Sequence, residues 1–265
     1  MTGRSESRKE TQPLTNQLFN AKTYTKVGTW NVRTLYQTGR LDQVKHEMNN
    51  YGLDILGVSE VRWTGQGQFN NGGITMLYSG NEEHHVNGVG IILSNTASRA
   101  LVGWKPVSER IITARLHTRH AKVTIVQVYA PTEVSTAEEK DNFYNQLQSV
   151  LDEIPSYDIK LVIGDFNAKL DGDRRGQDST IGPYGSAGQT NDNGERFVEM
   201  ASDSGISIGN TFFKHKRIHK VTWISPDGKT QNEIDCTSAL VIDGGHHYKT
   251  FALIEEQTQD RTTIW

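Results

Sequence analysis

The sequence has very little cysteine and no long apolar run, and both absences narrow the class of protein. Cys236 is the one cysteine in 265 residues, which excludes a framework of internal disulfides and suits a reducing compartment. No apolar run approaches the roughly 20 residues that cross a bilayer, and the N-terminus lacks the apolar core of a signal peptide. We therefore expect an intracellular protein with no membrane partner.

The sequence also lacks a strong excess of charge of either sign. Its formal net charge is -3, which neither indicates nor excludes nucleic acid, because phosphate binding depends on where Lys and Arg lie. With six prolines, 25 glycines and 35% hydrophobic residues, the composition is that of a globular domain with long loops. We expect a flexible lead-in over residues 1–22, one domain over 23–255 and a tail over 256–265.

The sequence does contain a regular series of short apolar segments separated by Gly, Asn and charged turns. Alternating or continuous apolar patterns predict strands at 24–31, 54–60, 73–79, 88–94, 110–117, 122–130, 160–165, 206–210, 221–225 and 232–236. Apolar stripes predict helices over about 40–51, 136–151 and 192–204, the second with a Thr136–Glu139 capping box and the third capped by Asp192. The strands of 72–129 suggest a meander, and the whole pattern predicts an α/β fold of two packed sheets with helices outside.

The segment Lys160 to Leu170, "KLVIGDFNAKL", is the most informative one. A buried-type strand ends in Asp165 and Asn167, which strand alternation would place on one face while Phe166 turns into the packing. Oxygen ligands of this kind suit a hard cation such as Mg²⁺. Asp and Asn after a strand are also common turn residues, so this segment alone leaves both interpretations open.

Polar side chains recur at the ends of the predicted strands. They are Asn31, Glu60, Tyr129, Asp165 with Asn167, and Asp235. Each alone is explained by solvent at a strand end, but together they would line a carboxylate-containing pocket suited to metal-assisted phosphodiester hydrolysis. A basic segment, "KHKRIHK", adds Lys214, Lys216, Arg217 and Lys220, which either track a nucleic-acid backbone or form a solvated turn.

Seven ordered motifs carry a resemblance to a known family. They are "TWNVRTL", "GVSEVRW", "VYAPT", "VIGDFNAKL", "NTFF", "VTWISPDG" and "EIDC", between about Lys26 and Cys236. This order resembles the endonuclease/exonuclease/phosphatase superfamily, in particular the endonuclease domains of RTE-type non-LTR retrotransposons and their craniofacial development protein 2-like relatives. The resemblance implies a four-layer αββα sandwich.

The resemblance also implies roles for the strand-end residues. Glu60 resembles the glutamate that binds Mg²⁺ or Mn²⁺, Asn31 the amide beside it, and Asp235 a further acidic residue of the metal and catalytic site. Asp165 is similar to the aspartate that orients the attacking water, Asn167 to the residue that holds the scissile phosphate, and Tyr129 to a phenol on a phosphate oxygen. Arginines that would contact DNA phosphates are Arg33, Arg62, Arg174 and Arg175.

The end of the sequence departs from the family pattern, which closes on a Ser-Asp-His motif. This sequence has none after Cys236. Either His247 replaces the missing histidine, with His246 in the place of the orienting aspartate, or the tail is unrelated to the site.

The expected function is a Mg²⁺-dependent endonuclease that nicks DNA and leaves a 3′-hydroxyl. The expected protein is a monomer, acts in the nucleus and belongs either to a cellular gene product or to a longer retroelement polyprotein. Two alternatives stay open: a weakened or inactive DNA-binding remnant, and a phosphodiesterase or phosphatase with another substrate.

Overall fold

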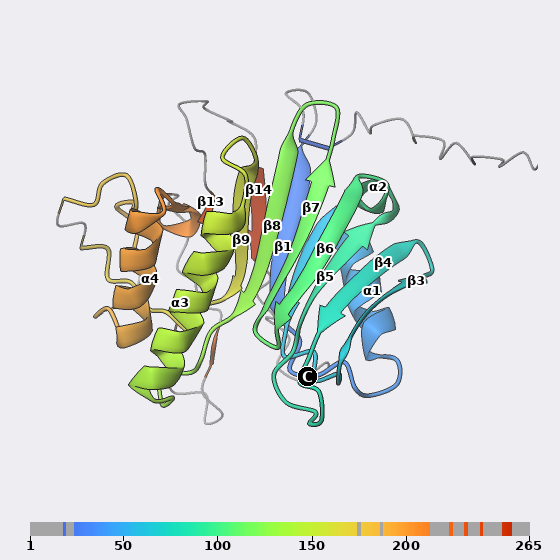
Figure 1. The fold of residues 1–265 in the computed structure, drawn as a ribbon, viewed down its shortest axis with the longest axis horizontal. Helices are drawn as coiled ribbons and strands as arrows, with labels where there is room; N and C mark the ends of the chain where they lie inside the picture. The colour runs from blue at the N-terminus through green and yellow to red at the C-terminus, as the bar shows by residue number, and fades with distance from the viewer. Residues whose placement is uncertain are drawn as a thin grey trace, which may run out of the picture.

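A computed structural model of the chain describes residues 18–19, 24–173, 176–185 and 188–212, together with the backbone of four short strands at 223–224, 231–232, 239–240 and 251–255 (Figure 1). Within these residues the strands form two six-stranded sheets and one two-stranded ribbon. No helix among them is long and apolar enough to cross a membrane.

The first sheet has the strand order β14-β1-β2-β5-β4-β3. Its strands are β1 (Thr25–Asn31), β2 (Ile55–Ser59), β3 (Gln66–Asn71), β4 (Ile74–Ser79), β5 (Val89–Ser94) and β14 (Phe251–Glu255). β1 is parallel to β2 and β14, and Asn31 pairs with Ser59. Because β1 and β2 are parallel neighbours, their carboxyl ends lie at the same edge of the sheet. The pairs β2–β5, β5–β4 and β4–β3 are antiparallel.

The second sheet has the order β10-β13-β9-β8-β7-β6. Its strands are β6 (Leu101–Ser108), β7 (Ile111–His117), β8 (Lys122–Tyr129), β9 (Ile159–Asp165), β10 (Ser207–Ile208) and β13 (Ala239–Leu240), and the ribbon pairs β11 (Trp223–Ile224) with β12 (Gln231–Asn232). β8 and β9 are parallel, with Tyr129 opposite Asp165. This sheet therefore also brings two carboxyl ends together.

Among the described residues, three longer helices cover the outer faces of the two sheets, and two short ones lie elsewhere. The longer helices are α1 (Arg40–Tyr51), α3 (Ala137–Glu153) and α4 (Asp192–Asp203), and the short ones are α2 (Asn95–Ser98) and the 3-10 helix η1 (Gly209–Phe212). The predicted capping box is confirmed, since Thr136 accepts from the Glu139 amide and the Glu139 side chain accepts from the Thr136 amide. α1 ends at Gly52, whose φ of 62° is the left-handed conformation that glycine adopts readily.

Three apolar clusters hold the layers together. Val44 and Met48 of α1 pack on the outer face of the first sheet. Between the sheets, Ile55 and Ile91 of the first pack in one cluster with Ile125 of the second. A third cluster joins the second sheet to α3 and α4, which lie side by side on one flank in Figure 1, with α1 on the other. The predicted sandwich of two mixed sheets flanked by helices is confirmed.

The meander predicted over 72–129 is divided between the two sheets. β4 and β5 pair in the first sheet, whereas β7 and β8 pair in the second. The short helix α2, begun by Ser94, whose hydroxyl accepts from the Ala97 amide, stands at the point where the chain changes sheet. Local apolar patterns predict strands but do not say which sheet each joins.

Strands β3, β6 and β13 and the short helix α2 were not predicted, and one predicted helix cap is wrong. β3 and β6 form the outer edges of the sheets, where exposed polar residues and Pro106 weaken the apolar pattern. The predicted cap Asp192 is wrong by one residue, because α4 is capped by Asn191, whose side chain accepts from the Gly194 amide at 2.9 Å.

Several predictions concern residues outside the described ranges. They are the lead-in before residue 18, Cys236, Asp235, His246 and His247, the arginines Arg174 and Arg175, the basic residues Lys214, Lys216, Arg217 and Lys220, and the tail from 256. These, with the domain boundaries, stay predictions.

Candidate functional site

The space between the sheets changes from apolar to polar at one end of four strands. Inward-facing positions end in Asn31 on β1, Ser59 on β2, Tyr129 on β8 and Asp165 on β9. Preceding inward residues on the same strands, such as Ile55, Ile125 and Leu161, belong to the apolar core. Each of these two pairs of strands is parallel, so each sheet brings two polar carboxyl ends to one edge. The hydrogen bond from Asn31 to Asp165 shows that the two edges face each other across the sandwich.

One amide connects the two sheets at this end. Asn31 Nδ2 donates to Glu60 Oε1 at 2.8 Å and to Asp165 Oδ2 at 2.9 Å. The Asn31 Oδ1 atom accepts from the Arg33 backbone amide at 3.0 Å, which fixes the orientation of the side chain. The carboxylates of Glu60 and Asp165 therefore converge on a single neutral donor.

Glu60 lies directly after β2 in a strained backbone conformation. Its φ is 56°, as is that of Arg62, and a left-handed residue other than glycine costs about 1–3 kcal/mol. The turn is held because Val61 N donates to Gly88 O at 3.0 Å and Arg62 N donates to Asn87 O at 2.9 Å. Arg62 Nη2 in turn pairs with Glu60 Oε2 at 2.8 Å.

Tyr129 faces the same carboxylates as a hydrogen-bond donor. Its hydroxyl donates to Glu60 Oε1 at 3.2 Å. Burial raises the pKa of the Tyr129 phenol well above its ordinary value, and the negative charges of Glu60 and Asp165 raise the pKa further. The phenol therefore keeps its proton at neutral pH and donates to oxygen acceptors.

Asp165 is 6% exposed and has both carboxylate oxygens engaged. Besides the bond from Asn31, Oδ1 accepts from the Asn167 backbone amide at 3.0 Å. β9 ends at Asp165, so strand alternation does not extend to Asn167, which adopts a φ of 50°. Asn167 Nδ2 donates instead to the Ala130 carbonyl at 3.0 Å, which ties the end of β9 to the end of β8.

Polar residues deeper between the two sheets support the cluster. Gln127 is fully buried and donates to Ser59 Oγ at 3.0 Å, and Ser59 Oγ donates to the Val128 carbonyl at 3.2 Å. Gly57 is required opposite, because a Cβ there would lie 1.8 Å from Gln127 Oε1. Arg110 supports Tyr129 from outside, donating to its carbonyl at 3.2 Å. The sequence predictions did not include Gln127 or Arg110. Gln127 could have been found, because it is a polar residue two positions before Tyr129 on a strand that is predicted to be buried.

The donor set suits a hard divalent cation. Glu60 and Asp165 supply two carboxylates. The cation that pairs with Glu60 is Arg62, and its side chain is 47% exposed. Asn31 also carries a hard amide oxygen, but in the structure this oxygen accepts from the Arg33 amide while the nitrogen faces the carboxylates. Among the residues that the structure describes, no three acidic, His or Cys side chains form a metal-binding group, and the predicted third carboxylate, Asp235, lies outside them.

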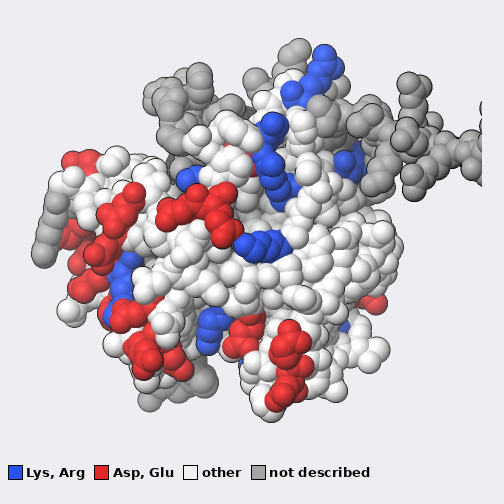
Figure 2. Space-filling view, viewed as in Figure 1, with Lys and Arg blue, Asp and Glu red and all other residues white. Residues whose placement is uncertain are grey.

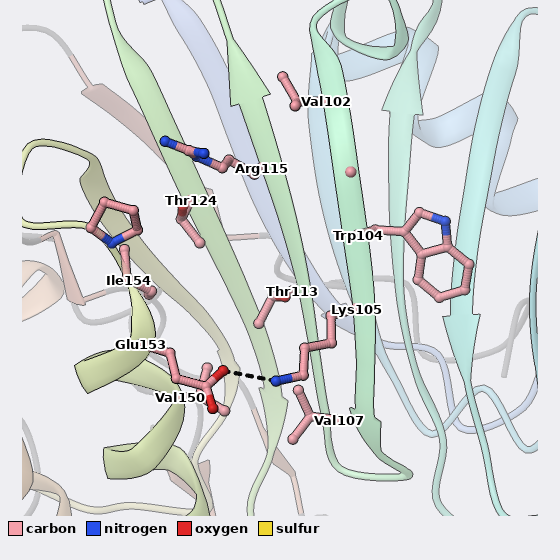
Figure 3. A pocket seen from close by; sticks show the side chains of 12 residues that line it. Val102, Trp104, Lys105, Val107, Thr113, Arg115, Thr124, Val150, Glu153 and Ile154 are labelled. Atoms are coloured by element: carbon pink, nitrogen blue, oxygen red, sulfur yellow. Dashed lines mark hydrogen bonds and ion pairs between the residues drawn. The ribbon is translucent and has the colours of Figure 1, made fainter.

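A groove of about 280 Å³ lies elsewhere, on the outer face of the second sheet (Figure 3). Trp104, Thr113 and Thr124 of the sheet and Ile154 after α3 line it, and a 2.7 Å ion pair joins Lys105 to Glu153. The strand-end cluster faces the space between the sheets, so the groove is separate from it.

Comparison with known proteins identifies the family. The profile of the Endonuclease/Exonuclease/phosphatase family matches residues 28–224. The chain belongs to this family. The match includes Asn31, Glu60, Tyr129, Asp165 and Asn167, and it ends before Asp235 and His247. As its name says, the family covers nucleases and phosphatases, which are hydrolases.

Two curated relatives in the family are versions of craniofacial development protein 2. The protein of Bos taurus is 37% identical over 211 residues, which cover 79% of this chain and 35% of the relative. That of Tragulus javanicus is 36% identical over 211 residues, covering 79% of this chain and 36% of the relative. The chain thus spans about a third of the length of these relatives.

Solved structures of other proteins share the fold. The endonuclease domain of TRAS1, a telomere-specific non-LTR retrotransposon, matches with a TM-score of 0.58 and 14% identity, over 83% of this chain and 86% of that domain. The AP endonuclease LMAP from Leishmania major matches with a TM-score of 0.61 and 13% identity, over 84% of this chain and 80% of that protein. At these identities the likeness establishes the fold alone.

Proposed function

We propose that the chain is a metal-dependent endonuclease that hydrolyses DNA phosphodiester bonds, nicking a target strand as retroelement endonucleases do. The observation that carries the proposal is the Asn31 amide that joins Glu60 of one sheet to Asp165 of the other. Two oriented carboxylates, a protonated phenol and an arginine then surround one point at the ends of four strands. The structural neighbours include a retrotransposon endonuclease domain and an AP endonuclease, which supports DNA as the substrate.

Glu60 would hold Mg²⁺ or Mn²⁺, with Asp235 as a further acidic ligand. Asn31 would become a ligand only after its amide group rotates, because its oxygen accepts from the Arg33 amide and its nitrogen faces the carboxylates. The ion would offset the negative charge that develops on the phosphate oxygens during reaction. Asn31 Nδ2 fixes the Glu60 carboxylate through Oε1, and Arg62 fixes it through Oε2, so the ligand is oriented before any ion binds. Such orientation by surrounding groups is characteristic of metal ligands.

Asp165 would orient the attacking water and accept its proton. Its carboxylate is fixed by Asn31 at one oxygen and by the Asn167 amide at the other. As the water oxygen forms a bond to phosphorus, the bond from phosphorus to the 3′ oxygen breaks. The products are a 5′-phosphate and a 3′-hydroxyl, whose proton comes from solvent or from His247.

Tyr129 and the arginines would position the DNA phosphate. The Tyr129 phenol is a donor at neutral pH and can move from Glu60 to a phosphate oxygen. Arg62 pairs with Glu60, and Arg33, whose backbone amide donates to Asn31, is exposed, so both would contact strand phosphates. We further propose that the protein acts as a monomer in the nucleus, where its DNA substrate lies.

A nicking assay tests the proposed function. The purified chain is incubated with supercoiled plasmid, and with a duplex containing one abasic site, in about 10 mM Mg²⁺ or Mn²⁺ or in excess EDTA. The expected result is conversion to open circles with either metal and none in EDTA, with nicks that a DNA polymerase extends because they carry a 3′-hydroxyl. Nicking that persists in EDTA would contradict a metal requirement. Cleavage of the abasic duplex alone would assign the site to repair-type substrates.

A further inference from the structure

The turn that carries Asp165 and Asn167 is held from outside by the start of α4. Asn167 has a φ of 50°, in the left-handed region that asparagine adopts more readily than most residues other than glycine. The adjacent Phe166 is fully buried and stacks on Phe197 of α4, with ring centroids 4.0 Å apart. α4 therefore packs against the residues on which the proposed water-orienting carboxylate depends.

Asn191 makes the polar part of this contact with both ends of its amide. Its Oδ1 accepts from the Gly194 amide at 2.9 Å, which caps α4, and from the Lys169 amide at 2.8 Å. Its Nδ2 donates to the Asn167 carbonyl at 3.0 Å and to Glu133 Oε2 at 2.7 Å. One side chain thus joins the helix cap, the turn after β9 and the loop after β8.

Close packing at Gly194 makes this contact rigid. A Cβ on Gly194 would lie 2.3 Å from the Lys169 carbonyl oxygen, so the first turn of α4 lies directly against the chain that leaves Asn167. The neighbouring Asn193 donates to the Pro131 carbonyl at 2.8 Å and is fully buried. The start of α4 is therefore fixed on two loops that both lead into the site.

We propose that Asn191 is a positioning residue for the nuclease centre, which holds Asn167 in its left-handed conformation and thereby fixes the Asp165 carboxylate. This rests on the proposed function and adds to it a residue outside the strand-end cluster. Asn191 reaches the reacting atoms only through Asn167, whose amide donates to Asp165 Oδ1. A misplacement of about 1 Å at a reacting group lowers the rate about 10²-fold.

The variant N191D separates capping from positioning. Aspartate caps a helix as well as asparagine does, so the bonds from Gly194 and Lys169 are kept. It has no N–H, so the bonds to Asn167 and Glu133 are lost, and a new carboxylate would face Glu133. The companion change E133Q removes that repulsion, because glutamine can donate where glutamate could not. The test therefore compares wild type, E133Q and N191D/E133Q.

The expected result is a loss of rate without a loss of fold. N191D/E133Q should unfold within about 2 °C of wild type. Its kcat in plasmid nicking should fall about 10- to 100-fold with little change in KM, while E133Q alone should behave as wild type. Hydrogen exchange should show the Asn167 amide exchanging faster in the double variant only, because its bond to Asp165 loosens.

Three results would overturn the proposal. They are an unchanged kcat in N191D/E133Q, an unchanged exchange rate at Asn167, and a double variant that fails to fold although the cap is kept. The failure of the proposed function is distinguishable, since it would appear as a wild type that does not nick DNA at all. In that case the exchange rate at Asn167 still tests whether Asn191 holds the turn.

Discussion

Asn31 determines the geometry of the cluster because one nitrogen donates to carboxylates of both sheets. An amide is neutral, so it orients Glu60 and Asp165 without balancing their charge. Arg62 balances part of it, but its side chain is about half exposed, and exposed pairs contribute at most about 1 kcal/mol. Two carboxylates and one guanidinium leave one negative charge that a bound cation can balance, which agrees with the proposed function.

The raised pKa of Tyr129 predicts a specific loss of stability at high pH. Tyrosine ionises near pH 10 in the unfolded chain, but in the folded protein burial and the nearby carboxylates raise its pKa. The native state then holds its proton while the unfolded state releases it, so the contribution is complete below about pH 10 and is lost as pH rises above that value.

Urea unfolding of wild type and Tyr129→Phe between about pH 8 and 11 measures this loss. The phenylalanine variant should lose less free energy of unfolding over this range than wild type, because it lacks the titrating phenol. Tyr78→Phe, which removes the hydroxyl of a partly exposed tyrosine of β4 outside the site, is the control for the loss of a hydroxyl alone. Parallel curves for wild type and Tyr129→Phe would contradict the raised pKa.

At the scale of elements, the site depends on the contact between β9 and α4. Phe166 and Phe197 are both fully buried, and their rings stack with an interplanar angle of 22°. Such aromatic pairs contribute about 0.5–1.5 kcal/mol beyond the area that they bury. The stacked pair therefore holds the residue between Asp165 and Asn167 against the helix.

A double-mutant cycle with Phe166→Leu and Phe197→Leu measures this coupling. The two changes should be non-additive by about 0.5–1.5 kcal/mol in the free energy of unfolding. The control pairs Phe166→Leu with Met48→Leu, because Met48 lies in the α1 cluster on the opposite flank, and these changes should add. Additive effects in the phenylalanine cycle would show that the rings pack without specific coupling.

The same contact shows how far sequence reasoning reaches. Apolar periodicity predicted β9 and α4, and motif order predicted that Asn31, Glu60, Tyr129 and Asp165 come together, as the structure shows. The sequence predicts a cap at Asp192, whereas the structure has it at Asn191. Asparagine and aspartate cap helices about equally well, so only three-dimensional contacts distinguish the two positions. The left-handed turn at Asn167 was likewise not predictable, since it depends on α4 and on Ala130.

At the scale of the whole molecule, surface charge disfavours the flank of α3 and α4 for DNA binding. Acidic side chains gather over α3 and α4 in Figure 2, where the first turns contribute Glu138, Glu139, Asp192 and Glu195. Such a surface repels phosphates. We therefore expect DNA not to bind the helical flank.

Metal binding should stabilise the folded chain independently of catalysis. For a dissociation constant near 1 mM, about 10 mM Mg²⁺ would add about 1.4 kcal/mol to the free energy of unfolding. Glu60→Gln should show little of this gain, because the amide cannot replace the charge of the carboxylate. Glu153→Gln, which removes a carboxylate near the outer groove, should keep the gain. Equal gains in wild type and Glu60→Gln would place the ion elsewhere.

The most direct test of the account is the nicking rate of Asp165→Asn at saturating Mg²⁺. The substitution keeps the size of the side chain but removes the base that Asn31 and the Asn167 amide orient. Asp203→Asn, at the exposed end of α4, is the matched control. The account predicts a rate about 10²- to 10⁴-fold below wild type for Asp165→Asn and an unchanged rate for Asp203→Asn, with both variants folded. Equal nicking by wild type and Asp165→Asn would contradict it.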